Sequence, residues 1–253
     1  MVITVKIIPK NILTIYGRNP VHEALLNDDI DFYRVHTAYS NKPNSQLKEI
    51  KQLCTQRGIE IESHDRLSLS RISKNRKQDQ GIAADIIAKN FGELDVFLAQ
   101  PTQKNFSLIA VENVTNPQNL GMIIRSVAGG YVDGLIIPRK GCAKIDGLVI
   151  KASAGTLFKT NILFCDDLPS AIEKAKSLGV NSYGLALDES IPLDQASITA
   201  PNIFIVGNET EGLTTATLKA CTQNIHIPMN NNVESLNVAI TAALLSFRTF
   251  LKK

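Results

Sequence analysis

Three polar segments in the second half of this sequence carry side chains that could bind a polar ligand and act on it. The first covers residues 112–121, where Asn116 precedes Pro117 and leads into an expected helix that carries Arg125. Steric contact with the proline ring holds Asn116 extended or in a turn, and Arg125 would lie about one or two turns into the helix. Asn-Pro is also a common turn signal, and helical arginines are usually solvated, so a purely structural role stays open.

The second segment, residues 206–213, runs from an apolar stretch straight into a turn with two carboxylates and two glycines. Gly207 permits close approach of the backbone to a ligand, or an unusual φ angle. Many loops between a strand and a helix have this form, so the segment alone is weak evidence. The fingerprint GxGxxG is absent, which argues against a standard Rossmann cofactor loop.

The third segment begins with Ile227-Pro228-Met229 and continues to the start of a C-terminal helix. Ser235 and Asn237 stand at that start, and either could be a plain N-cap, although a cap explains only one of them. The helix itself is predicted from apolar side chains at helical spacing over residues 236–251. Its apolar stripe is expected to be either core or a subunit interface.

Short apolar runs would position these segments at one edge of a sheet. They are Leu108–Val111, Leu135–Ile137, Ile162–Phe164, Tyr183–Leu187, Ile203–Val206 and Ile225–Ile227. Helical patterns separate most of them, and continuous apolar runs flanked by helices indicate a parallel sheet covered on both faces. In such folds ligands sit at the carboxyl ends of the strands, where the three polar segments stand.

The first 90 residues read as a separate small α/β unit. Helices are expected over residues 19–26 and 44–57, and strands over 32–37, 59–62 and 81–87. Residues 91–104 show no sustained period and resemble a connector. The predicted organisation is therefore a small domain over 1–90, a linker over 91–104 and a larger α/β domain over 105–253.

Composition places the chain among ordinary globular proteins. Apolar residues make up 44% and charged residues 20%, no stretch approaches the roughly 20 apolar residues that span a bilayer, and the N-terminus does not resemble a secretory signal. The four cysteines form no CxxC pair and the four histidines are scattered. We therefore expect no metal site, no disulfide framework and a cytoplasmic location.

The net charge of +3, from 27 cationic and 24 anionic side chains, is too mild to identify a nucleic-acid partner. Four cations nevertheless fall within residues 71–77: Arg71, Lys74, Arg76 and Lys77. This cluster is either a solvated helix end or a patch that contacts phosphates.

Taken together, the polar segments resemble the motifs of the SpoU/TrmH family of RNA ribose 2′-O-methyltransferases. The three stretches ENVTNPQNLGMIIRS, IVGNETEGL and IPMNNNVESLNVAITAA occur in the family's order. IYGRNPVHEAL resembles the start of the small RNA-binding domain found in many members. The chain departs from the family at Asp79, where a histidine often stands, and at Gly129-Gly130, where the extra glycine should loosen the helix end.

The resemblance implies a fold and partners. It implies an α/β chain whose C-terminal SPOUT methyltransferase domain, a parallel sheet with a trefoil knot, follows a small α/β RNA-binding domain resembling a ribosomal protein. It also implies a homodimer through the knotted domain, S-adenosylmethionine (SAM) as methyl donor, RNA as substrate and no metal. No membrane partner is expected.

The resemblance also assigns roles to particular residues. Arg125 would stabilise the developing alkoxide, Glu209 would accept a proton or orient Arg125, and three polar residues would position the reacting groups: Asn116, Ser235 and Asn237. Five residues would surround SAM: Gly207, Gly212, Ile227, Met229 and Leu236. Independently of the resemblance, the charge pattern leads us to expect RNA contacts from the 71–77 cluster, and we add Arg18 to them.

The identity of the substrate stays open at this point. The two-domain layout most resembles the methyltransferase that modifies a guanosine of large-subunit (23S) ribosomal RNA, free or in a precursor particle. Methylation of tRNA, or of rRNA for antibiotic resistance, is an alternative. A non-catalytic ribosome assembly factor and an α/β enzyme acting on a phosphorylated metabolite are alternatives from other classes.

Overall fold

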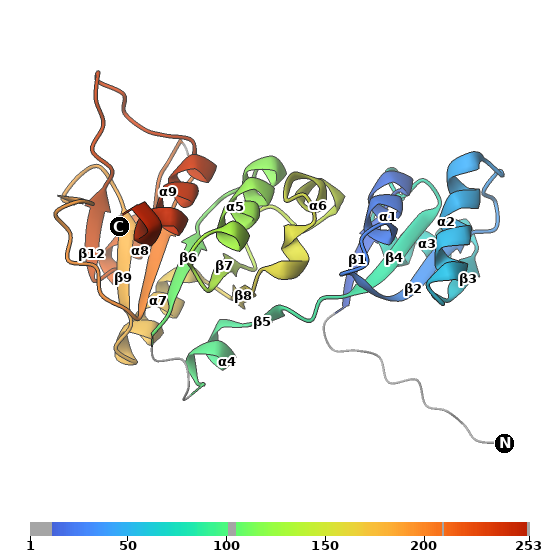
Figure 1. The fold of residues 1–253 in the computed structure, drawn as a ribbon, viewed down its shortest axis with the longest axis horizontal. Coiled ribbons are helices and arrows are strands. Elements are labelled where there is room, and N and C mark those ends of the chain that lie inside the picture. Colours follow the sequence, from blue (N-terminus) through green and yellow to red (C-terminus); the bar gives the residue numbers. More distant parts are fainter. Residues whose placement is uncertain (1–11, 101–104, 209, 252–253) are drawn as a thin grey trace. The chain divides into compact units, whose positions relative to one another are not determined.

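The computed structural model describes residues 12–100, 105–208 and 210–251. The chain divides into two compact units, Met1–Lys89 (unit 1) and Asn90–Lys253 (unit 2) (Figure 1). The segment over residues 1–11, from which we expect no secretory signal, lies outside the described residues, as does Glu209. No helix in the described part of the chain is long and apolar enough to cross a membrane.

Unit 1 is built on a four-stranded sheet with the order β1-β4-β2-β3, accompanied by three helices. Its elements are β1 (Ile12–Tyr16), α1 (Arg18–Leu25), β2 (Asp31–Ala38), α2 (Ser45–Gln56), β3 (Ile61–His64), α3 (Arg66–Ser73) and β4 (Ile82–Ile87). The predicted helices and strands are all present. β1 and α3 were not predicted, and α3 is an easy helix to miss because serines and arginines interrupt its apolar spacing.

In unit 1, several strand ends and helix starts meet at one end of the sheet. β4 runs antiparallel to β1 and β2, while β3 runs parallel to β2. The carboxyl ends of β1, β2 and β3 and the start of β4 therefore meet at the same end. Helices α1 and α2 begin there, because each follows a strand that ends there.

Unit 2 contains an eight-stranded sheet with the order β10-β12-β9-β11-β6-β7-β8-β5, in which every neighbouring pair is parallel. The strands are β5 (Phe91–Glu93), β6 (Ser107–Val111), β7 (Gly134–Pro138), β8 (Ile162–Cys165), β9 (Asn181–Leu185), β10 (Ile191–Pro192), β11 (Asn202–Val206) and β12 (Gln223–His226). All six apolar runs named above lie in or overlap strands. The predicted parallel sheet is confirmed.

Helices cover both faces of this sheet. They are α4 (Leu94–Leu98), α5 (Pro117–Gly129), α6 (Gly147–Ala152), α7 (Leu168–Ser177), α8 (Thr215–Ala220) and α9 (Val238–Leu251), with a 3-10 turn at Thr156–Lys159. α5 packs against α6 and α9, whereas α7 packs against α4 and α8 (Figure 1). Burial from both sides explains why strands such as β7 and β11 are buried along their whole length.

The prediction of a connector over residues 91–104 is wrong for residues 91–98, which form a strand and a helix. β5 pairs in parallel with β8, and the α4 side chains Leu94 and Phe97 belong to the core of unit 2. A three-residue edge strand followed by a five-residue helix is too short to show a period. Residues 101–104 lie outside the described residues.

The expectation that the glycine pair 129–130 loosens the end of α5 is also wrong. The backbone N–H of Tyr131 donates to the carbonyl of Ser246 at 2.7 Å, which ties this helix end to α9. A Cβ on Gly130 would stand 2.6 Å from the Ser246 Cβ and 2.8 Å from its carbonyl oxygen. Gly130 is therefore required for the close packing of α5 on α9.

We expect opposite effects from alanine at these two glycines. Gly130→Ala should destabilise the protein by about 1–3 kcal/mol through overpacking. Gly129→Ala should stabilise it slightly, by about 0.4–1 kcal/mol, because its Cβ would meet only the tip of Phe247 at 3.7 Å. Urea denaturation of the two variants checks the contrast, and equal stabilities would contradict it.

Candidate active site

The three polar segments meet at the carboxyl edge of the unit 2 sheet. β6 and β11 are neighbours in register, with Val111 opposite Val206, so the segments that follow them lie side by side. The Asn208 amide Nδ2 donates to the carbonyl of Asn113 at 3.2 Å. The N–H of Glu112 donates to the carbonyl of Val206 at 2.9 Å. The arrangement predicted from strand ends is therefore present for the first two segments.

Glu112 holds the second segment in place, a role that the sequence did not reveal. Its buried carboxylate accepts hydrogen bonds from the N–H (2.7 Å) and hydroxyl (3.0 Å) of Thr214. It also accepts one from the Thr217 hydroxyl at 2.5 Å. Because Thr214 caps α8, this carboxylate anchors the loop between β11 and α8. The position of Glu112 directly after a buried strand could have indicated this role from the sequence.

The third segment reaches the first through Asn237. Its Oδ1 accepts from the N–H of Ala239 at 2.9 Å, so Asn237 is the residue that caps α9. Its Nδ2 donates at 3.3 Å to Oδ1 of Asn119, a buried residue of α5. The helix that carries Arg125 is thus hydrogen-bonded to the start of α9. Ser235 is exposed and does not serve as this cap.

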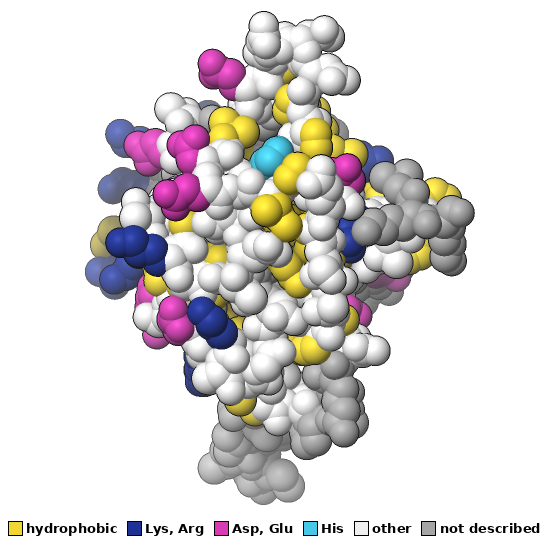
Figure 2. Space-filling model, turned by 90° about the vertical axis from the view of Figure 1, so that its left-hand side faces the viewer, with side chains coloured by type: hydrophobic (Ala, Val, Ile, Leu, Met, Phe, Trp, Pro, Cys, Tyr) yellow, Lys and Arg dark blue, Asp and Glu magenta, His cyan; other side chains and the backbone are white. Residues whose placement is uncertain are grey.

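A cavity of about 420 Å³ lies between the loops that follow β9, β11 and β12. Its lining includes all five residues predicted to surround SAM: Gly207, Gly212, Ile227, Met229 and Leu236. Ser235 and His226 also line it. Figure 2 views the molecule from the side on which β12 lies in Figure 1, and apolar side chains gather in the middle of this face beside a histidine.

The loop after β9 is a part of the lining that was not predicted from the sequence. Residues 185–188 contribute to the cavity, and they follow a strand end by the same rule that identified the other segments. His226 was also missed. Its Nδ1 lies 2.9 Å from the hydroxyl of Ser190, which fixes the ring at the cavity wall.

The reason for glycine at position 207 differs from the expected one. A Cβ there would stand 2.3 Å from the carbonyl carbon and oxygen of Gly212 and 2.6 Å from the N–H of Leu213. Gly207 therefore permits close approach of the chain to itself rather than to a ligand. Its φ angle is ordinary, whereas Gly212 adopts the left-handed region with φ of 67°.

The predicted catalytic residues are only partly brought together. Asn116 caps α5, with its side chain accepting from the N–H of Gln118. Arg125 lies more than two turns into α5, further than expected, and is exposed. The cavity lining within the described residues does not include Asn116, Arg125 or Asn237. Glu209, their predicted companion, lies outside the described residues.

Cysteine thiols near these segments are poor nucleophiles. Burial raises the pKa of Cys142, whose thiol faces the carbonyl of Val111. Burial, assisted by the charge of Glu112, raises the pKa of Cys221 to about 12. Both thiols therefore stay protonated at neutral pH, and thiolate chemistry is disfavoured at this site.

In unit 1, the parallel register of β2 and β3 unites side chains that appear scattered in the sequence. The ligand atoms of His36, Glu62 and His64 lie within 4.8 Å of one another. His36 Nδ1 lies 2.9 Å from His64 Nε2 and its Nε2 lies 3.1 Å from Asp85, while Glu62 pairs with Arg34. Each of these side chains therefore has a protein partner that stabilises it without a metal ion.

The same network perturbs Asp85. Burial alone would raise the pKa of its carboxyl, but hydrogen bonds from His36 and from Thr14 (2.7 Å) outweigh burial and lower it. Asp85 thus stays ionised and holds the His36 ring in the sheet.

The predicted RNA-contacting cations also belong to unit 1. All four residues of the 71–77 cluster are exposed, and Arg18 at the start of α1 is half-buried. Asp79, where the family often has histidine, is fully buried against Arg66 at 2.8 Å and accepts from Ser73 and Gly81. Its carboxylate shapes the segment that presents the cluster.

Comparison with known families assigns the chain. Residues 87–247 match the model of the SpoU rRNA methylase family. The chain belongs to the SpoU family. Residues 14–92, which cover most of unit 1, match the model of the RNA 2′-O ribose methyltransferase substrate-binding domain. This SpoU chain is accordingly an RNA methyltransferase.

Named relatives agree with this assignment. The SpoU chain is 30% identical over 233 residues to an uncharacterized tRNA/rRNA methyltransferase of Mycolicibacterium vanbaalenii, covering 91% of this chain and 74% of the relative. A relative so named in Mycobacterium leprae is also 30% identical, with 92% and 75% covered.

Solved structures share the fold. An rRNA methyltransferase from Sinorhizobium meliloti with bound AdoMet has a TM-score of 0.65 at 19% identity, covering 96% of this chain and 88% of that one. The SpoU methyltransferase AviRb from Streptomyces viridochromogenes, also in complex with AdoMet, has a TM-score of 0.64 at 20% identity, covering 96% and 92%.

Proposed function

We propose that this SpoU enzyme transfers a methyl group from SAM to the ribose 2′-hydroxyl of a guanosine in 23S rRNA, free or in a precursor particle. The observation that carries the reaction is the cavity at the strand ends, whose lining includes every residue that the resemblance assigns to SAM. The 23S guanosine is supported by the two-domain layout alone. Because RNA sequence is usually read at loops and bulges, the target is an unpaired nucleotide.

The cavity suits a ligand of the size and chemistry of SAM. Its volume of about 420 Å³ falls in the range for small-molecule sites. Leu213, Ile227 and Leu236 offer apolar contact for an adenine ring, and Gly207 and Gly212 bring backbone to the wall of the cavity. When bound, SAM supplies an electrophilic methyl group on sulfur.

Arg125 is proposed to act electrostatically. Arginine stays protonated at any physiological pH, which makes it a poor general base. A guanidinium can instead stabilise the alkoxide that develops on the ribose and hold the adjacent phosphate. Asn116 and Asn237 act as positioning residues, since they cap the helices α5 and α9. Glu209 is proposed to accept the proton or to orient Arg125, and Ser235 to hold the amino-acid end of SAM.

We propose that unit 2 contains the trefoil knot of its family and forms a homodimer through that region. Exposed apolar side chains on α5 and α9 support an interface: Met122, Ile240, Leu244 and Phe250. For unit 1 we propose the ribosomal-protein-like RNA-binding role. A cytoplasmic location is supported by the four cysteines, which are all free thiols.

Methyl transfer from radiolabelled SAM to total RNA from a strain lacking this gene, fractionated by size, tests the proposal. Label in large-subunit rRNA, with one linkage resistant to alkaline hydrolysis, is the expected result. Label in tRNA would keep the chemistry and overturn the substrate. No label, with SAM binding intact, would overturn free RNA as the substrate and point to a particle substrate or to a non-catalytic assembly factor.

Neutralising the 71–77 cluster should weaken RNA binding and flatten its salt dependence. Each lost phosphate contact lowers the slope of log affinity against log salt by about 0.7–0.9, so replacing all four cations with alanine should lower it by up to about 3.6. Lys89→Ala is the matched control, because Lys89 follows β4 at the other end of the sheet and pairs with Asp31. An unchanged slope in the quadruple variant would show that the cluster is a solvated helix end that does not contact phosphates.

A further inference from the structure

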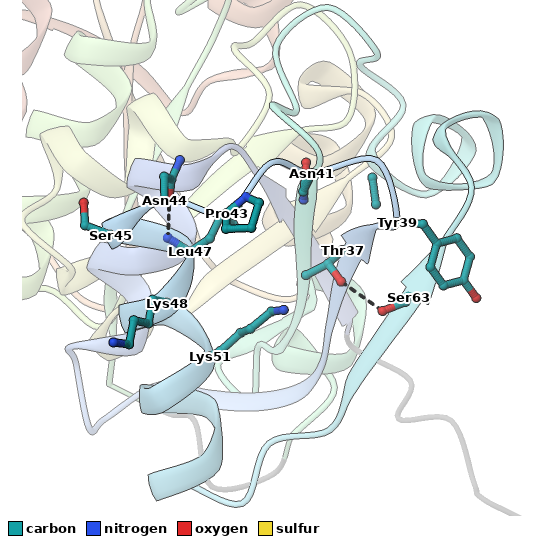
Figure 3. Close-up of a pocket in the computed structure, with 11 residues that line it drawn as sticks. Thr37, Tyr39, Asn41, Pro43, Asn44, Ser45, Leu47, Lys48, Lys51 and Ser63 are labelled. Atoms are coloured by element: carbon teal, nitrogen blue, oxygen red, sulfur yellow. Dashed lines mark hydrogen bonds between the residues drawn. The ribbon is translucent and has the colours of Figure 1, made fainter.

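A second cavity, of about 610 Å³, lies within unit 1 and takes no part in the proposed active site. It opens where β2 and β3 end, beside the first turns of α2 (Figure 3). Its volume is ample for a nucleotide. Two lysines of α2, Lys48 and Lys51, line it, and none of its described lining residues is acidic.

The charge of this cavity suits a phosphate. Lys48 and Lys51 are exposed and lie one turn apart on α2, and neither has an ion-pair partner among the described residues. Lys51 extends from α2 toward Thr37 and Ser63 on the opposite wall (Figure 3). Asn44 and Ser45 bring the positive end of the 12-residue helix α2 to the same cavity.

The remaining walls suit a nucleoside. The hydroxyls of Thr37 and Ser63 lie 3.3 Å apart and can donate to or accept from a base or ribose. Tyr39 stands at the rim on the far side from α2 (Figure 3), and 75% of its surface is exposed. Its backbone is fixed, because its N–H donates to the carbonyl of His64 at 2.9 Å. An exposed ring on a fixed backbone is a stacking platform for an unpaired base.

The cavity adjoins the residues predicted to contact RNA. Asn41, which lines it, donates from Nδ2 to the carbonyl of Gly81 at 2.7 Å, at the end of the segment that bears the basic cluster. Gln46 of α2 donates to the side chain of Asn19 at 2.7 Å, next to Arg18. One end of unit 1 therefore combines the cavity, its lysines and the other candidate cations.

We propose that this cavity binds an unpaired segment of the RNA substrate, distinct from the nucleotide that is methylated. A phosphate lies at Lys48 and Lys51, and an adjoining base stacks on Tyr39. The bases of a blunt duplex are stacked on one another and cannot occupy this platform. The inference rests on RNA being the substrate, as proposed above.

Fluorescence anisotropy with the full chain tests it, using a labelled RNA hairpin with a six-nucleotide loop and a blunt duplex of the same stem. The wild-type chain should prefer the hairpin. Tyr39→Ala should weaken hairpin binding by roughly tenfold, and Tyr39→Phe should retain it, because stacking needs the ring and not the hydroxyl. Lys48→Ala with Lys51→Ala should lower the salt slope by about 0.7, the value for one phosphate on a single strand, whereas Lys89→Ala should leave it unchanged.

Three outcomes would overturn the inference. They are equal binding of hairpin and duplex by the wild-type chain, unchanged hairpin affinity in Tyr39→Ala, and displacement of the hairpin by micromolar guanosine monophosphate, which would indicate a mononucleotide site. Methyl transfer to RNA by the wild-type chain would stand in each case. Failure of this inference is therefore distinguishable from failure of the proposed function.

Discussion

Arg125→Ala should reduce methyl transfer to RNA by about 100- to 1000-fold while leaving SAM affinity unchanged. The magnitude is that of losing one preorganised group that stabilises developing charge. The affinity for SAM should be unchanged because Arg125 is not among the described residues that line the cavity. Single-turnover transfer from radiolabelled SAM, together with calorimetric titration of SAM, gives the two quantities separately.

Two controls make this result specific to the guanidinium. Arg125→Lys keeps the charge but loses the planar fork, so we expect an intermediate rate. Ser126→Ala removes a neighbouring α5 hydroxyl that donates to the carbonyl of Met122 within the helix and should retain activity. If Arg125→Ala retains full activity, Arg125 is not the central catalytic group. A parallel loss of SAM affinity would show instead that the substitution disturbs the cavity.

Gly207→Ala should abolish SAM binding and lower the melting temperature. The new Cβ would stand 2.3 Å from the Gly212 carbonyl group, so two backbone segments must separate. Overpacking of this kind costs about 1–3 kcal/mol in protein cores, and here the strain falls on the loop that lines the cavity. Thermal unfolding and SAM titration measure the two consequences.

Gly212→Ala is the matched comparison for Gly207→Ala. A Cβ at position 212 would enter open space, but the backbone there has a φ of 67°, so alanine should cost only about 1–2 kcal/mol of backbone strain. SAM affinity should fall less than in Gly207→Ala. If the two variants are equally affected, the close approach of residues 207 and 212–213 does not shape the cavity.

Local sequence patterns predicted the elements better than the contacts between them. The apolar run at residues 203–206 identifies β11 because its side chains are buried on both faces, and such burial requires an unbroken apolar stretch. Asn237 could likewise be recognised as a possible cap, because capping depends on the residue type at the start of a helix. The strand β5 could not be recognised, because only its pairing with β8 makes three residues a strand.

Long-range pairings explain what the sequence could not reveal about the site. Glu112 gains its role from Thr214, and His36 gains its neighbours from the register of β2 against β3. The reason for glycine at 207 lies in the path of the chain at residues 212–213. In each case the residue type was visible, but its partner was set by topology.

The anchor at Glu112 has a consequence for synthesis of the chain. Glu112 and Thr214 are separated by 102 positions. Similarly, β6 has neighbouring strands on both sides only after β11 has been synthesised. A ribosome adding about 5–20 residues per second needs roughly 5 to 20 seconds to make the intervening chain. A nascent chain that stops before Thr214 lacks the Glu112–Thr214 anchor. Only the contacts of Glu112 with Val206 and of Asn208 with Asn113 then hold the second polar segment against the first. Premature termination between β11 and α8 would therefore yield a protein with most of its strands and no cofactor cavity.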